Sequence, residues 1–202
     1  MSTPRLHFSS FLRVAGPACA LLALGGLGGC GEEDTGLSAF APACPHFDVP
    51  GSIADRFVYN GKGLDIGNQI SHTQILAVNG DCSDGPKDAQ HRPLTRVRLS
   101  LALQQERGPA ATHTSEDVPY FVAVVQDGKI IDKKTFTDTV RIPPSHDTQR
   151  LNTPLRFIDI PTGKNPQVSP YSMEIGFQLT RDELNYNRQH LKNVANFESH
   201  VQ

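Results

Sequence analysis

Ser145, His146 and Asp147 are the side-chain types of a catalytic triad, in which a histidine takes the proton of a serine hydroxyl. Three consecutive residues do not easily converge as a triad does, and these three follow two prolines, so the segment is typical of a turn. The sequence also lacks a G-x-S-x-G segment, which would place a serine nucleophile on a sharp strand-to-helix turn. We therefore predict that this protein is not an enzyme.

The sequence shows no pattern of metal ligands or of a nucleotide-binding turn. The cysteines form no C-x-x-C pair and lack the short spacings of zinc ligands. Segment 61–67 has the spacing G-x-G-x-x-x-G, without a strand pattern before it or a helix pattern after it. The histidines that follow residue 30 form no H-x-H or H-x-x-x-H pair: His46, His72, His91, His113, His146, His190 and His200. We expect neither a metal nor a cofactor.

The beginning of the chain has the features of an export signal. Arg5 and Arg13 precede any acidic residue, and segment 14–24 is apolar or small, which is long enough for a signal peptide but shorter than the roughly 20 residues of a membrane span. The segment Leu27-Gly28-Gly29-Cys30 then resembles the lipobox of bacterial lipoproteins. The resemblance implies that residues 1–29 are a cleaved lipoprotein signal peptide and that the Cys30 thiol carries a diacylglycerol.

Two or three acyl chains would anchor the protein firmly to a membrane, since each buried CH₂ contributes about 0.8 kcal/mol. Gly31 follows the cysteine, whereas an aspartate there commonly retains Gram-negative lipoproteins in the inner membrane. We predict an outer-membrane location facing the periplasm, with the inner membrane as the alternative. The other interpretation is an ordinary secreted protein that is cleaved at another site, such as Ala18-Cys19-Ala20.

Removal of the signal would leave about 173 residues, the size of one domain. Because Arg5 and Arg13 leave with it, 19 basic residues become 17 against 21 acidic ones, and the formal charge falls from −2 to −4. A clustered positive excess is needed to bind nucleic acid or anionic lipid, so we expect no nucleic-acid partner. No second apolar run is long enough for a membrane helix.

Cys44 and Cys82 are the cysteines that would remain without lipid. In an oxidising periplasm two thiols most simply pair, so we predict a disulfide bond between them. It would close a loop of about 38 residues and contribute about 4 kcal/mol on the chain-entropy model. The pair lies too early in the chain for the usual inter-sheet bridge of an immunoglobulin domain.

Short strands with turns between them dominate the rest of the chain. Residues 30–43 are small and acidic and are predicted to be a lipid-anchored tether, and residues 44–179 to be one domain. Val97, Leu99, Leu101 and Leu103 alternate with polar residues, as in a strand with one solvated face. The segments predicted to be strands are 69–78, 95–104, 118–126, 129–136, 151–160 and 171–179. We predict a mostly β fold, an immunoglobulin-like antiparallel β-sandwich.

Several turns and loops are predicted between these strands. Asp127-Gly128 is typical of a hairpin turn, and Asn79-Gly80-Asp81 is expected to end the first strand, before a polar loop at 83–93. Segment 106–119 is expected to be a long loop, either a crossover between sheets or a binding element. Arg107 in this loop, Tyr120 and Arg188 are treated as binding candidates, and the Arg107 guanidinium could fork onto a carboxylate. The alternative is structural, with Tyr120 in a core strand and the two arginines paired with aspartate or glutamate.

The chain is predicted to end differently, with a short α-helix and a tail over residues 180–202. Thr180 and Glu183 form a capping box, and Leu184 and Leu191 recur at helical spacing up to about residue 195. This narrow apolar stripe would pack either on the edge of the sandwich or on a partner protein.

Several strings resemble a family of uncharacterised envelope lipoproteins from alphaproteobacteria. The resemblance covers roughly residues 44–188 and rests on R-G-P-A at 107–110, V-P-Y-F-V-A-V-V at 118–125, and G-F-Q-L-T at 176–180 followed by Glu183-Leu184 and Tyr186-Asn187-Arg188. It implies a lipid-anchored envelope protein and supplies no catalytic residues. We therefore predict a non-catalytic interaction or structural module with an envelope protein as partner. The alternative is a lipoprotein that binds a small ligand or a glycan, which would need exposed aromatic rings around a concave site.

Overall fold

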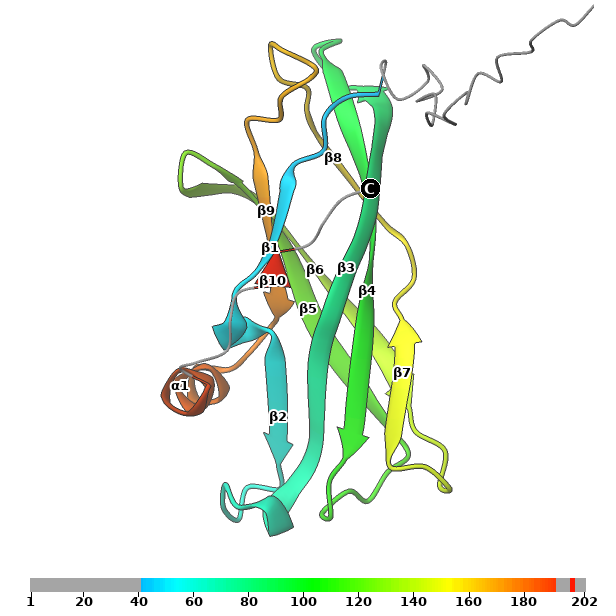
Figure 1. Cartoon of the computed structure of the whole chain (residues 1–202), viewed down its shortest axis with the longest axis vertical. Helices are drawn as coiled ribbons and strands as arrows, with labels where there is room; N and C mark the ends of the chain where they lie inside the picture. Colours follow the sequence, from blue (N-terminus) through cyan, green and yellow to red (C-terminus); the bar gives the residue numbers. More distant parts are fainter. Residues whose placement is uncertain (1–40, 192–196, 199–202) are drawn as a thin grey trace, which may run out of the picture. The chain divides into compact units, whose positions relative to one another are not determined.

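The computed structural model describes residues 41–191 and 197–198 (Figure 1). The predicted signal peptide 1–29, Cys30 and most of the tether 30–43 lie outside the described residues. Within the described part of the chain, no helix is long and apolar enough to cross a bilayer. The elements are β1 (His46–Val49), η2 (Gly51–Ile53), β2 (Asp55–Tyr59), η3 (Ile66–Asn68), β3 (Gln69–Lys87), β4 (Pro93–Arg107), β5 (Ser115–Gln126), β6 (Lys129–Arg141), β7 (Thr148–Asn152), β8 (Arg156–Pro161), β9 (Ser172–Phe177), α1 (Arg181–His190) and β10 (Phe197–Glu198).

Two five-stranded sheets pack face to face, so the predicted β-sandwich with one short helix is confirmed. Sheet A has the order β10-β1-β9-β5-β6. Sheet B has the order β2-β3-β4-β7, and β8 also pairs with β4, so that β7 and β8 occupy successive parts of the same edge. All strand pairs are antiparallel except β1 with β9. The long hairpin β3–β4 crosses in front of β5 and β6 in Figure 1.

The alternating apolar residues of β4 and the apolar run of β5 contribute much of the core between the sheets. Val97, Leu99, Leu101 and Leu103 are all fully buried, as their spacing predicts. Strand β5 pairs with β9 on one side and β6 on the other, and its segment Val122 to Val125 is buried throughout. A strand inside a sheet that also carries a packed face has little contact with water, which explains its almost continuous apolar sequence.

A β-bulge in β3 reverses which residues face the core. The register with β4 shifts between Ile75 and Ala77. Before the bulge the odd-numbered residues up to Ile75 are buried, and after it the inward positions are even-numbered, beginning with Val78. Cys82 follows this second parity, and its side chain therefore points toward sheet A.

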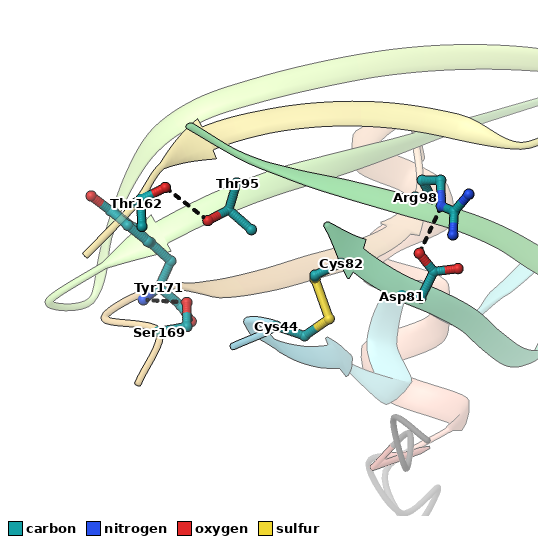
Figure 2. The surroundings of a disulfide bond; sticks show 8 residues. All are labelled: Cys44, Asp81, Cys82, Thr95, Arg98, Thr162, Ser169 and Tyr171. Carbon is teal, nitrogen blue, oxygen red and sulfur yellow. Dashed lines mark hydrogen bonds and ion pairs between the residues drawn. A yellow bond between two sulfur atoms is a disulfide. The ribbon is translucent and has the colours of Figure 1, made fainter. Parts of the chain in front are cut away.

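Cys44 and Cys82 form the predicted disulfide bond, with their Cα atoms 5.4 Å apart (Figure 2). Cys44 lies two residues before β1 of sheet A, and Cys82 lies in β3 of sheet B, so the bond joins elements of the two sheets. Asp81 points the other way and pairs with Arg98 across the hairpin, Nε to Oδ1 at 2.7 Å. Successive residues of a strand face opposite sides, which places the disulfide and this ion pair on different faces.

Some turn predictions were wrong because a tertiary contact determines the local structure. Asn79-Gly80-Asp81 does not end a strand, since β3 continues to Lys87 and the turn comes at 88–92. A Cβ at Gly80 would lie 2.8 Å from the Phe47 ring and 2.9 Å from the Arg98 carbonyl oxygen, so this glycine permits close packing of β1 on the hairpin. The predicted strand 151–160 is also interrupted, at Thr153-Pro154-Leu155, and forms β7 and β8.

The hairpin turn and the helix start were predicted correctly. Asp127 and Gly128 have φ values of 50° and 71° and connect β5 to β6. Thr180 Oγ1 accepts from Glu183 N at 3.2 Å and Thr180 N donates to Glu183 Oε2 at 2.6 Å, which is the predicted capping box. The helix ends at His190, and residues 192–195 of the predicted helix lie outside the described residues. In the tail, Phe197–Glu198 pairs with β1.

Candidate functional site

Arg56 spans the side of the sandwich where edge strand β2 faces β5. Its Nη1 donates to Glu116 Oε1 at 2.7 Å, and its Nε lies 3.4 Å from Glu183 Oε1 on α1. Glu116 Oε2 accepts a second bond from Gln105 Nε2 at 3.0 Å. The Arg56 and Glu116 side chains are only 15% and 22% exposed, so this ion pair is substantially shielded from water. One arginine thus connects both sheets and the helix.

Next to this ion pair, the inner face of sheet B changes from apolar to polar. Ser71 lies directly opposite Arg107 in the β3–β4 register, and Thr73 lies opposite Gln105, so these four side chains share one face. Ser71, Thr73 and Gln105 are at most 2% exposed. Ser71 Oγ, Thr73 Oγ1 and Arg107 Nε have no hydrogen-bond partner among the described residues. Buried polar atoms are normally bonded, so these three atoms mark this end of the interior as unusual.

A pocket of about 320 Å³ opens at this polar end. Ser71, Gln105 and Arg107 line it from sheet B, Arg56 from β2 and Glu116 from β5. Segment 111–114, which belongs to the loop between β4 and β5, also lines it. The loop predicted at 106–119 is therefore shorter than expected, since β4 extends to Arg107 and β5 begins at Ser115.

Gly108 holds this loop against β3. Its N–H donates to the Ile70 carbonyl oxygen at 2.8 Å, and Ala110 N donates to the Gln69 carbonyl oxygen at 2.9 Å. A Cβ at Gly108 would lie 2.0 Å from the Gln69 carbonyl oxygen, so no other residue permits this approach. The start of the loop that lines the pocket is thus fixed on β3 by backbone hydrogen bonds.

A second hollow, of about 460 Å³, lies on the other side of β2, between β2, segment 61–64 and the first turns of α1. Three aromatic rings, those of Phe57, Tyr59 and Tyr186, line it. Tyr59 Oη donates to Tyr186 Oη at 3.0 Å, and the two rings meet edge to face at 5.8 Å. Burial, and then the bond to Tyr186, raises the pKa of the Tyr59 hydroxyl far above its ordinary value, so it stays protonated. We name this hollow the aromatic hollow.

The charge of the aromatic hollow is one-sided. Asp182 and Glu183 line it, and the carboxylate of Asp65 is close enough to contribute to the raised pKa of Tyr59. No lysine, arginine or histidine is among the described residues that line it. Glu183 is shared with the capping box and Arg56, whereas Asp182 is exposed. The hollow therefore combines aromatic faces with negative charge.

A histidine and a buried aspartate lie behind the aromatic hollow. His72 Nε2 lies 2.7 Å from Asp55 Oδ1, and its ring stacks on Phe57 with centroids 4.1 Å apart. Asp55 is 3% exposed. A histidine held by a carboxylate is half of a triad, yet its second nitrogen faces Glu106 Oε2, at 3.9 Å, rather than a hydroxyl. We interpret this pair as a support for the Phe57 ring.

The binding candidates named from the sequence lie in different places. Arg107 lines the 320 Å³ pocket. Tyr120 is fully buried, where its hydroxyl donates to Asp138 Oδ2 at 2.8 Å and accepts from Arg156 Nε at 2.9 Å, and Arg188 is exposed on α1. Leu184 and Leu191 are half-buried. The helix itself packs on η2 and β2 of its own domain rather than standing free.

Arg107 was named as a binding candidate from the sequence, whereas Arg56, Ser71 and the rings of the aromatic hollow were not, although a signal existed. The inward parity of β4 continues from Leu103 to Gln105 and Arg107, which predicts that these polar side chains also face the interior. Phe57 and Tyr59 belong to β2, a short strand that was not predicted, and their burial shows no alternation. The partners of these residues come from distant parts of the chain, and local patterns do not identify them.

Two further candidates from the sequence are the segment 145–147 and a metal site. Ser145 Oγ lies 3.0 Å from His146 Nδ1 in an exposed turn, where His146 N donates to the Pro143 carbonyl oxygen at 3.0 Å, as predicted for a turn. Among residues 41–191 and 197–198 no group of three or more metal-ligating side chains is placed to hold an ion.

No family model, curated protein or solved structure matches this chain.

Proposed function

We propose that this protein is a lipid-anchored lipoprotein of the bacterial envelope, and that its β-sandwich is a non-catalytic binding module. The basic and apolar leader that ends in Leu27-Gly28-Gly29-Cys30 supports the anchor. Gly31 after the cysteine supports the outer membrane, with the domain in the periplasm. The Cys44–Cys82 disulfide bond is consistent with an oxidising compartment.

The aromatic hollow is the observation that carries the binding role. A lysine or arginine side chain is attracted by the faces of tyrosine and phenylalanine rings, and by carboxylates at the same site. Phe57, Tyr59 and Tyr186 provide the rings, and Asp182 provides a carboxylate exposed to solvent. We infer that the partner is an envelope protein that inserts a basic side chain between β2 and α1.

Glycan binding is the second candidate, and the same three rings favour it. Sugar rings present apolar C–H faces that pack on aromatic rings, and the hydroxyls of Tyr59 and Tyr186 would bond to sugar hydroxyls. This hypothesis gives no particular role to the negative charge of Asp182. The two candidates therefore differ in what Asp182→Asn and Tyr186→Phe should do.

Purification of the lipidated protein from its native host, followed by identification of the proteins recovered with it, tests the proposal. Asp182→Asn should reduce the recovery of the partner, and added salt should do the same because it screens the charge. Tyr186→Phe keeps the ring and should retain the partner. Asp84→Asn, an exposed aspartate of β3, is the matched control. If the ligand is a glycan, we expect the opposite: its binding should be lost in Tyr186→Phe and should change little in Asp182→Asn.

The anchor needs its own test. Cys30→Ser removes the thiol that would be acylated, so the variant should leave the membrane fraction and accumulate in the soluble one. A Cys30→Ser protein that remains in the membrane fraction would show that the lipobox interpretation is wrong.

A further inference from the structure

We propose that the 320 Å³ pocket between the sheets binds a small monocarboxylate, held by Arg107 and Ser71. This site is separate from the aromatic hollow, although Val58 of β2 lines both. It adds a small-molecule ligand to the proposed function and does not depend on the envelope protein partner.

Arg107 lines the pocket without an ion pair among the described residues. Arg56 is paired with Glu116, and the other carboxylate of the pocket, that of Asp117, accepts from Thr139 Oγ1 at 2.6 Å. Arg107 Nη2 donates only to main-chain oxygens, those of Ile142 at 2.5 Å and Pro143 at 3.1 Å. No carboxylate among the described residues forms an ion pair with Arg107. Carbonyl oxygens orient the guanidinium but do not neutralise it, so Arg107 is the cation of the pocket that is free to pair with an anionic ligand.

Unused hydrogen-bond donors lie beside this cation. Ser71 is 2% exposed and lines the pocket directly opposite Arg107 in the register of β3 and β4. Ser71 Oγ and Arg107 Nε are both buried and have no partner among the described residues. A carboxylate has two oxygens that only accept, which fits two neighbouring donors on different side chains. The pocket thus offers the charge of Arg107 to one end of a ligand, and the two unpaired donors would bond to it after a small rotation toward the pocket.

The remaining walls set the size and the charge of the ligand. Val58, Ile70 and Ile142 are apolar and line the same pocket, so the group attached to the carboxylate is a short apolar one. Glu116 and Asp117 lie on the β5 side of the pocket and would repel a second negative charge. These neighbours favour a monocarboxylate over phosphate or a dicarboxylate.

Calorimetric titration of the purified full chain with butyrate tests the proposal, with butyramide and inorganic phosphate as comparison probes. Butyramide has the same shape without the charge. We expect millimolar binding of butyrate and at least about tenfold weaker binding of the other two, because an ion-paired anchor is lost or opposed. No binding of butyrate up to roughly 20 mM, or equal binding of butyramide, would overturn the proposal.

Two variants and a control assign the binding to these residues. Arg107→Gln should weaken butyrate binding about tenfold and Ser71→Ala about threefold, while Arg92→Gln on the β3–β4 turn should change nothing. Ser71→Ala removes a hydroxyl that has no partner, so it should fold as the wild type does even if Arg107→Gln does not. Arg107→Lys keeps the charge but not the fork of the guanidinium. If the single variants Ser71→Ala and Arg107→Lys both bind butyrate as tightly as the wild type, the assignment is wrong.

Discussion

The side-chain amide of Asn187 donates to the backbone oxygen of Asp55 at 2.6 Å, and this bond holds α1 beside β2. The same Nδ2 also donates to the Ser52 carbonyl oxygen at 3.1 Å, and Asn187 is 1% exposed. The buried Asn187 therefore holds α1, which forms one wall of the aromatic hollow, against β2, which forms the other. Without it, Tyr186 and Asp182 would lose their position relative to Phe57 and Tyr59.

Asn187→Ala should detach the helix more than it unfolds the domain. It leaves two carbonyl oxygens without their donor, and the cost of about 1–3 kcal/mol falls on the docking of α1. Hydrogen exchange of the amides in Arg181–His190 should accelerate, while that of the β3–β4 hairpin stays slow. Asn185→Ala, exposed on the same helix, is the control and should leave exchange unchanged. Equal protection in both variants would contradict the role of Asn187.

The ion pair between Arg56 and Glu116 should stabilise the sandwich more than exposed pairs do. Arg56→Met should lower the free energy of unfolding by roughly 2 kcal/mol, between the values of exposed and buried pairs. Arg98→Met is the matched control, because Arg98 and Asp81 are 47% and 51% exposed, and it should cost less than about 1 kcal/mol. Urea unfolding measures both, and similar losses in the two variants would contradict this prediction.

The disulfide bond should contribute to the stability of the domain. On the chain-entropy model, replacing Cys44 and Cys82 by serine lowers the free energy of unfolding by about 4 kcal/mol for a sequence separation of 38 residues. Guanidinium unfolding of the double variant and the wild type gives the difference. Thiol labelling of the denatured wild type without reductant should find neither cysteine reactive, and two reactive thiols would refute the bond.

Asp159 should make stability fall in acid. It accepts two bonds from Arg96, at 2.7 and 2.8 Å, and these hold the pKa of its carboxyl below the ordinary value. Since the pKa is lower in the folded state, the contribution is complete above the ordinary value of about 4 and is lost as pH falls through the folded pKa.

The comparison of wild type with Asp159→Asn checks this sign. Because the pair is partly exposed, the difference in unfolding free energy at pH 7 should be no more than about 1 kcal/mol, and it should shrink as the pH falls through the lowered pKa of Asp159. Arg96→Gln should show the same loss of pH dependence. A difference that grows toward low pH would contradict the argument.

The sequence predicted those features that neighbouring residues determine. The Asp127-Gly128 turn, the capping box of Thr180 and Glu183, and the alternation of β4 are each specified within a few residues, and each was confirmed. The disulfide bond was predicted because only two cysteines remained once Cys30 was assigned to lipid.

Features that depend on distant partners were not predicted. Gly80 is a typical turn residue in its local sequence, yet it lies inside β3 because the Phe47 ring packs against it. Strand β2 is short, and its residues contact distant parts of the chain. Arg56 bonds to Glu116, 60 residues away, and Tyr59 bonds to Tyr186, 127 residues away. Alternation reveals which side of a strand is buried but not which side chains meet across the interior.

The most direct test of the central proposal is photo-crosslinking in intact cells of the native host. A photoreactive amino acid replaces Leu64, which lines the aromatic hollow and is 63% exposed, and in a second strain it replaces Arg98 on the outer face of sheet B. We predict that one envelope protein is crosslinked from position 64 and not from position 98, and that its crosslinked peptide contains a lysine or an arginine. The same products from both positions, or none from position 64 while a known envelope complex is captured in parallel, would contradict the proposal.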